Sequence, residues 1–237
     1  MRILAIDTAT ESCSAALWVD AGVRACEKRL ERGHAAHILL MVDEVLAEAG
    51  LRLPHLDAIA FGRGPGAFTG VRLAASVAQG LAFGAGLPVV PVSDLRALAQ
   101  RALEAQPEAT QVLVCTDARM REVYWGCFAR DAEGLSRALG EERVGPPEQV
   151  RLPEPWVDPA HAPIAVCGAG AGFAAYPELR ALLGASPRAI LDNLLPRAQE
   201  VVRLAVSEVR AGRVMSPEQA LPVYLRDDVT HKRPPGH

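Results

Sequence analysis

The stretch ILAIDTATESCSAALWV, residues 3–19, contains the pattern that decides the fold. The apolar run 3–6 ends at Asp7, which is typical of a buried strand that carries an acid to its C-terminal end. Residues 12–19 predict a second strand, and a turn signal separates them from a third strand at 23–30. This antiparallel opening argues against a purely parallel dinucleotide-binding fold.

The second half of the chain begins in a similar way. Residues 111–116 predict a strand that ends at Asp117, residues 122–129 a second strand and residues 135–144 a third. A polar connection containing Pro107 separates the halves. We therefore expect a duplicated α/β fold with a cleft between two lobes, an N-terminal lobe at 1–106 and a C-terminal lobe at 107–237.

The remaining segments alternate between helix and strand patterns. Apolar residues recur every three or four positions in the helical segments, which indicates amphipathic helices. Ser93 is a suitable N-cap for one of them. The expected helices and strands are a helix at 34–49, a strand at 56–61, a helix at 68–83, a strand at 88–92, a helix after Ser93, a strand at 164–167 and a helix at 196–211.

Composition restricts the class of protein. Half of the 237 residues are hydrophobic, which predicts a packed core. The formal net charge of −3 excludes the strongly basic surface of a protein that binds nucleic acid alone, but not a subunit that helps another protein to handle RNA. Five scattered cysteines without C-x-x-C spacing favour a reducing compartment. Without a signal-peptide or membrane-span pattern, we expect a cytoplasmic protein with no membrane contact.

Three short motifs could contribute to a nucleotide site. An acid and hydroxyls at a strand corner can position a metal-bound phosphate, and glycines let backbone amides approach one. The candidate residues are Asp7, Thr8, Gly64, Gly66, Gly168 and Gly170. Each motif also has a structural interpretation: a hydrogen-bonded turn, a tight turn that seats a helix, and close strand–helix packing. Ala9 replaces the glycine usual in such phosphate hairpins, and Pro65 lacks an amide proton, so any such site is degenerate.

His34 and His37 lie three residues apart, so one helix face presents both, and they could share a metal ion. A metal site needs further ligands, and Glu44 is two turns from His37. We expect a surface or interface pair and no bound metal. Signatures of a serine or cysteine nucleophile are absent, and no catalytic residue is predicted.

Four segments together resemble the TsaB (YeaZ) family. They are ILAIDTATESCSAAL, GRGPGAFTGVRLAAS, TDARMREVYW and PVYLRDDV, and they extend over nearly the whole chain. The second is the most specific, because G-P-G-x-F-T-G-x-R is close to a family signature. The resemblance implies a two-lobed actin-like, Hsp70-like and sugar-kinase-like fold, in the ribonuclease H-like class.

The resemblance also implies a role in forming N6-threonylcarbamoyladenosine at position 37 of tRNAs that read codons starting with A. The paralogue TsaD transfers the carbamoyl group with a metal held by an H-x-x-x-H pair. TsaB-like proteins form homodimers in isolation and act as non-catalytic scaffolds that activate TsaD together with the ATPase TsaE. Contact with tRNA is then indirect, and ATP or ADP is expected only within the complex. The spacing of His34 and His37 and the Ala9 substitution depart from the catalytic pattern.

Two other functions stay open. One is a metal- or nucleotide-dependent enzyme of the same fold, a glycoprotease-like metallopeptidase or an ATPase, that uses His34, His37 and Asp7. The other is an ATP-binding module without catalysis that uses Asp7, Gly168 and Gly170.

The first two helices carry more apolar positions than a single core-facing stripe requires. We therefore expect them to form a four-helix contact with a related subunit, with one surface serving both the homodimer and TsaD. The expected contact residues are His37, Ile38, Met41, Val42, Arg72, Leu73, Ser76 and Val77. We expect Leu39, Val45 and Leu46 to pack inside the lobe instead.

Overall fold

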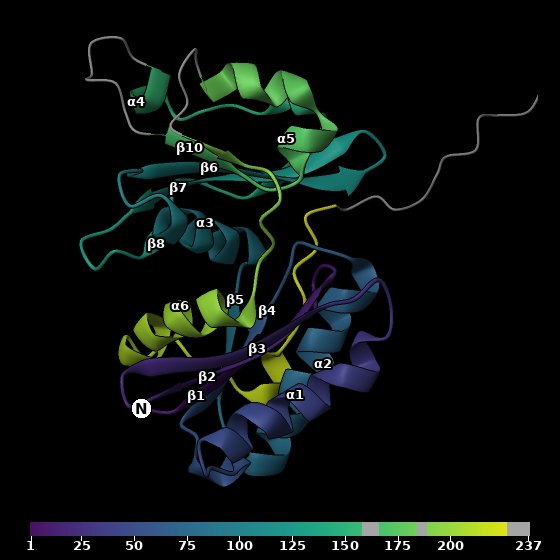
Figure 1. Ribbon diagram of the computed structural model, residues 1–237, viewed down its shortest axis with the longest axis vertical. Helices are drawn as coiled ribbons and strands as arrows, with labels where there is room; N and C mark the ends of the chain where they lie inside the picture. The colour runs from purple at the N-terminus through teal and green to yellow at the C-terminus, as the bar shows by residue number, and fades with distance from the viewer. Residues whose placement is uncertain (158–165, 184–188, 227–237) are drawn as a thin grey trace, which may run out of the picture.

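Two mixed sheets, one from each half of the chain, organise the structure (Figure 1). The computed structural model describes residues 1–157, 166–183 and 189–226. Part of the strand expected at 164–167 and the end of the C-terminal tail lie outside the described residues. Within the described ranges, no helix is long and apolar enough to cross a bilayer.

The first sheet has the strand order β3-β2-β1-β4-β5. β1, β2 and β3 form the expected antiparallel meander, and β4 and β5 add in parallel to β1. The strands span Ile3–Asp7 (β1), Ser12–Val19 (β2), Gly22–Arg29 (β3), Ala58–Gly62 (β4) and Val89–Val92 (β5). Because parallel strands run in the same direction, Asp7, Gly62 and Val92 end at the same edge of the sheet.

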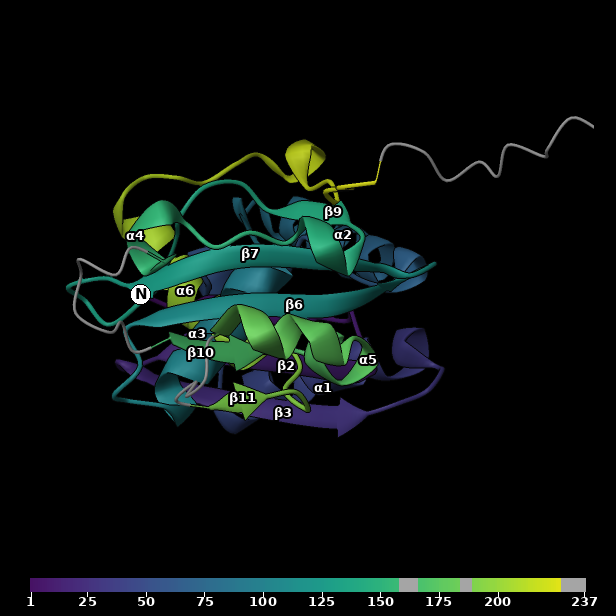
Figure 2. The same ribbon diagram turned by 90° about the horizontal axis from the view of Figure 1, so that it is seen from above.

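The second sheet repeats this arrangement in the order β11-β10-β6-β7-β8, with β9 also paired to β7 (Figure 2). β6 and β7 form an antiparallel hairpin, while β10 and β11 add in parallel. The strands span Gln111–Arg119 (β6), Glu122–Arg130 (β7), Ser136–Ala138 (β8), Arg143–Gly145 (β9), Val166–Ala169 (β10) and Ile190–Leu191 (β11). The matching strand orders confirm the duplicated α/β fold.

The strand predicted at 135–144 is wrong as a single element. The structure divides it into β8 and β9, which pair with opposite ends of β7. Between them the chain leaves the sheet, and Gly140 adopts a φ of 93° that favours glycine.

Helices cover both faces of the first sheet. α1 (His34–Glu48) and α2 (Phe68–Ala85) cover its outer face, and α6 (Ala198–Arg210) covers the inner face. Side chains of β1 alternate between the two layers: Leu4 and Ile6 pack beneath α1 and α2, whereas Ile3 and Ala5 pack beneath α6. This double coverage explains why the whole of β1 is buried.

Each half of the chain provides one helix to the other half's sheet. α3 (Asp94–Ala105) belongs to the first half but packs on β6, β7 and β10, and α6 belongs to the second half but packs on β1, β2 and β4. The two helices contact each other between the sheets (Figure 1). Each of the lobes expected at 1–106 and 107–237 therefore contributes one helix that packs on the sheet of the other lobe.

Short elements complete the second half. They are the 3-10 turns at Pro147–Gln149, Pro177–Leu183 and Pro217–Gln219, and the short helices α4 (Glu154–Val157) and α5 (Gly172–Ala175). A further 3-10 turn at Leu53–His55 precedes β4. After α6 the chain returns along the first sheet, where Met215 bridges to Val89, and then crosses toward the β6–β7 hairpin. We call residues 213–226 the C-terminal strap.

Candidate functional site

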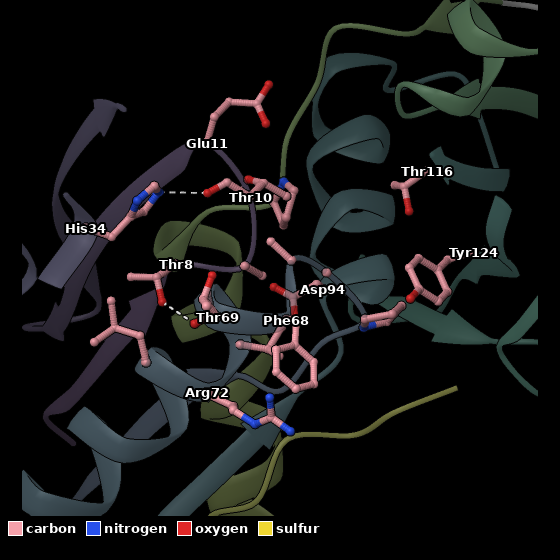
Figure 3. Close-up of a pocket in the computed structure, with 18 of the residues that line it drawn as sticks. Thr8, Thr10, Glu11, His34, Phe68, Thr69, Arg72, Asp94, Thr116 and Tyr124 are labelled. Atoms are coloured by element: carbon pink, nitrogen blue, oxygen red, sulfur yellow. Dashed lines mark hydrogen bonds between the residues drawn. The ribbon is translucent and has the colours of Figure 1, made fainter. Parts of the chain in front are cut away.

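A cleft of about 1240 Å³ opens between the two lobes. The turn after β1, the starts of α1 and α2, the end of β6 and the C-terminal strap form its walls (Figure 3). The strap is held in place by Val223, whose N–H donates to the Arg63 carbonyl at 2.8 Å, and by Arg226, which donates to the Ala118 carbonyl at 3.1 Å and pairs with Glu122.

The turn after β1 is filled by the chain's own backbone. A Cβ added to Gly70 would lie 2.1 Å from the Thr8 carbonyl oxygen, and one added to Gly66 would lie 2.5 Å from that of Ala9. Two hydrogen bonds fix this contact: the Ala67 N–H donates to the Ala9 carbonyl at 2.7 Å, and the Thr8 hydroxyl donates to the Gly70 carbonyl at 2.7 Å. The start of α2 thus packs directly on the turn after β1, and the other side of this turn lines the cleft.

Asp7 lies behind this contact and is fully buried. One of its carboxylate oxygens, Oδ1, accepts the Ala9 N–H at 2.8 Å. Burial raises the pKa of Asp7 to about 6. A carboxyl group that is sealed from the cleft and bonded to its own turn is a poor ligand for a phosphate-bound metal.

Asp94 is the site residue that the sequence analysis missed. It is the first residue of α3, two positions after the end of β5. Its carboxylate accepts the Gly64 N–H, and its own N–H donates to the Gly64 carbonyl at 3.0 Å. Burial raises its pKa well above the usual value, and the neighbouring charge of Asp7 raises it further. The available signal was its position after the third parallel strand, whose end meets that of β1 at one sheet edge.

The six candidate nucleotide residues do not form one site. Thr8 and Gly66 line the cleft, whereas Gly64 is buried under the strap, with an added Cβ 3.0 Å from the Val223 carbonyl oxygen. Gly168 and Gly170 belong to the second lobe, where Gly168 packs on Phe173 and Gly170 packs on the Cys115 carbonyl. The structure therefore corrects the assignment of these two glycines: close packing, the alternative interpretation, explains them.

The cleft nevertheless has a cationic and aromatic mouth. The Arg72 guanidinium lies 3.2 Å from the ring centroid of Phe68 and 5.1 Å from that of Tyr224, which the strap provides. α1 and α2 both begin here, and their first turns contain no acidic residue. Free helix N-termini and an arginine favour anionic or polar groups at this mouth.

His34 and His37 differ in their surroundings. The His34 ring Nε2 lies 2.8 Å from the Thr10 carbonyl oxygen, so this ring is turned toward the corner after β1 (Figure 3). His37 is half-buried on α1. Among the residues that the structure describes, no three His, Cys, Asp or Glu side chains are grouped as a metal site would require.

The predicted partner-binding residues divide into buried and accessible sets. Ile38, Met41 and Val42 belong to the core beneath α1, so their assignment to a surface contact is wrong. Arg72 and Ser76 are exposed, and His37, Leu73 and Val77 are partly exposed. The sheet-facing side of α1 is fixed by the periodicity of 38, 41, 42, 45 and 46, all of which are buried.

The outer sides of α1 and α2 carry apolar residues that the sequence analysis placed wrongly or missed. Leu39, expected inside the lobe, is 49% exposed, whereas Val45 and Leu46 are buried as expected. Leu40 is 65% exposed and Phe83 is 70% exposed, and neither was predicted as a contact residue. Leu39 and Leu40 lie in the first half of α1, whereas Phe83 lies near the end of α2.

Comparison with known proteins identifies the family. The family model for TsaD, a tRNA N6-adenosine threonylcarbamoyltransferase, matches residues 28–231. Two relatives named tRNA threonylcarbamoyladenosine biosynthesis protein TsaB, from Escherichia coli and Haemophilus influenzae, are each 42% identical across 100% of this chain and cover 99% and 98% of their own lengths. The chain belongs to the TsaB (YeaZ) family.

A solved TsaB-family structure confirms the fold. YeaZ from Pseudomonas aeruginosa is 46% identical, with a TM-score of 0.84 over 94% of this chain and 99% of that chain. The two lobes of related topology are therefore the actin-like arrangement that the TsaB resemblance implied.

A glycine substitution tests the filled turn. Gly70→Ala should lower the free energy of unfolding by about 1–3 kcal/mol, because the new Cβ would force α2 away from Thr8. Gly80→Ala is the matched control in the same helix: its added Cβ meets nothing within 4 Å, so it should raise stability by up to about 1 kcal/mol. Urea unfolding of both variants measures the difference, and equal effects would contradict the packing described.

Proposed function

We propose that this chain is a non-catalytic scaffold subunit in the synthesis of N6-threonylcarbamoyladenosine at position 37 of tRNAs reading codons that start with A. It dimerises with a TsaD-type threonylcarbamoyltransferase and activates it. Family membership supports the pathway, and the full burial of Asp7 supports the absence of catalysis. The similarity to TsaB proteins over the full length of the chain is the observation that carries the proposal.

Several features of the cleft support a role outside catalysis. An acid at the end of β1 can position a metal-bound phosphate only where the ligand reaches it, yet Asp7 is fully buried and bonded to the Ala9 N–H. Metal-dependent chemistry at the His34 and His37 pair would need a third ligand, yet no His, Cys, Asp or Glu among the described residues completes such a group with them. Among the described residues, no contact supports either enzyme alternative, the nucleotide-dependent one or the metal-dependent one.

The partner surface is the outer face of α1 and α2. Leu39 and Leu40 on α1 are exposed, and Leu73 and Val77 on α2 are partly exposed. Burying such apolar side chains against a second helical pair would stabilise a four-helix contact. The same face serves the homodimer in isolation and TsaD in the complex, with His37, Arg72 and Ser76 beside it.

The remaining partners act through the complex. TsaE supplies ATPase activity, and any ATP or ADP near this chain binds only when the complex is assembled. A net charge of −3 suits a subunit that reaches tRNA through its partners instead of holding the phosphate backbone itself. These steps take place in the cytoplasm.

Reconstitution tests the scaffold role. Threonylcarbamoyl transfer to tRNA by TsaD and TsaE, supplied with threonylcarbamoyl-adenylate, is expected to depend on added chain and to saturate at one chain per TsaD. The measurement follows labelled threonine in tRNA. Transfer that is equally fast without the chain would refute the activator role.

A charge substitution tests the surface. Leu40→Asp should weaken both self-association and TsaD binding at least about tenfold, because a carboxylate would enter an apolar contact. Leu221→Asp is the matched control, since Leu40 and Leu221 are both 65% exposed and Leu221 lies in the strap. Analytical ultracentrifugation and surface plasmon resonance measure the two associations. Equal behaviour of the two variants would remove α1 from the interface.

A further inference from the structure

Two carboxyl side chains meet in the interior behind the cleft. Asp7 ends β1 and Asp94 follows β5, while β4 lies between these strands and ends at Gly62. A Cβ added to Gly62 would lie 2.6 Å from Asp94 Oδ1 and 3.1 Å from Asp7 Oδ2. Only a residue without a side chain leaves space for the two acids to reach each other across the central strand.

Each acid uses one oxygen in a hydrogen bond and turns the other toward its neighbour. Asp7 Oδ1 accepts the Ala9 N–H, and Asp94 Oδ2 accepts the Gly64 N–H. Asp7 Oδ2 and Asp94 Oδ1 are buried and accept no hydrogen bond from any described residue. Two ionised carboxylates in this position would repel each other, whereas one proton between them makes one oxygen a donor and the other an acceptor.

The charged groups around Asp7 and Asp94 do not neutralise a second negative charge on the pair. Glu200 on α6 and Glu27 on β3 face Asp7, and Arg197 pairs with both of these glutamates. The thiol of Cys13 also lies near Asp7, and burial raises its pKa to about 11.

On the other side, Glu142 faces Asp94. Glu142 is bonded to Ser93 and paired with Arg63, and the positive charge of Arg96 also acts on it. In the described part of the chain, no arginine, lysine or histidine pairs directly with Asp7 or Asp94. The pair therefore lacks a cation that would stabilise a double negative charge.

We propose that Asp7 and Asp94 hold one proton between them at neutral pH. This shared proton, which we call the lock, holds the glycine loop between β4 and α2 against the rest of the first lobe. Asp94 holds Gly64 through both its carboxylate and its N–H, and Asp7 holds the turn that α2 packs upon. Loss of the proton would place two charges behind the cleft wall, and Asp94 lines that wall, so water would enter there. The lock does not depend on the proposed scaffold function.

The direction of the pH dependence follows from the proton balance. Unfolded aspartates have a pKa of about 3.9 and are ionised near neutral pH, whereas the folded pair keeps one proton. Burial raises the pKa of Asp7 to about 6 and that of Asp94 well above its usual value. Because the folded state binds the extra proton, the folding equilibrium constant should fall as pH rises above the unfolded pKa. The fall is up to about tenfold per pH unit and ends where the folded pair releases its proton.

Equilibrium unfolding between pH 6 and 8 tests the lock. In Asp94→Asn the amide oxygen can accept from Gly64 and the amide nitrogen can donate to Asp7, so the variant imitates the protonated pair. The ratio of folding constants, variant over wild type, should rise with pH, by up to about 100-fold over this range. Asp43→Asn, which removes an exposed acid of α1, is the control and should keep the wild-type slope. Parallel profiles for wild type and Asp94→Asn would overturn the proposal.

Infrared spectroscopy detects the proton directly and does not require a stable Asp94 variant. The wild-type protein at pH 7.5 should show the carbonyl stretch of a protonated carboxylic acid. Asp7→Asn and Asp94→Asn, whichever folds, should each lose that band, while Asp43→Asn keeps it. Absence of the band in the wild-type protein would overturn the proposal. Persistence of the band in the folded Asp7 and Asp94 variants would also overturn it, because the band would then belong to Glu142 or Glu200.

Discussion

The contact between the start of α2 and the turn after β1 is the constraint on which the cleft depends. Glycine at positions 66 and 70 lets backbone meet backbone, with the Thr8 and Ala9 carbonyls directly against the helix. A larger residue at either position would push α2 outward and open the turn. The same contact therefore shapes one wall of the cleft and sets the angle at which α2 presents its outer face.

The exchanged helices connect this contact to the rest of the molecule. α3 carries Asp94 at its first residue and packs on the second sheet, so the position of the glycine loop is tied to both lobes. α6 buries its apolar side chains on the inner face of the first sheet, and the strap that follows it crosses back over Gly64. A shift of one lobe against the other would have to break hydrogen bonds at the loop before α2. The cleft is thus fixed by both halves of the chain.

Local patterns in the sequence predicted most of the strands, the long helices and the duplication, because apolar periodicity and turn residues determine these features locally. The single strand expected at 135–144 was wrong. The family followed from the resemblance of four sequence segments. They could not predict Asp94, whose burial depends on the missing side chain of Gly62 on a neighbouring strand. The wide apolar stripe of α1 also left its orientation open, so Ile38 and Met41 were placed on the surface and Leu39 in the interior, and the exposed Leu40 was missed. Gly168 and Gly170 followed a strand as expected, yet their lobe packs them against Phe173 and Cys115. Features set by contacts distant in sequence were the ones missed.

We propose that the isolated chain binds no nucleotide, because the acid at the end of β1, Asp7, is buried and bonded to its own turn. Isothermal titration calorimetry with ATP and Mg²⁺ on the chain alone measures this most directly. We predict no saturable heat of binding for the isolated chain, whatever is found after TsaD is added. Saturable binding of one nucleotide per isolated chain would contradict it.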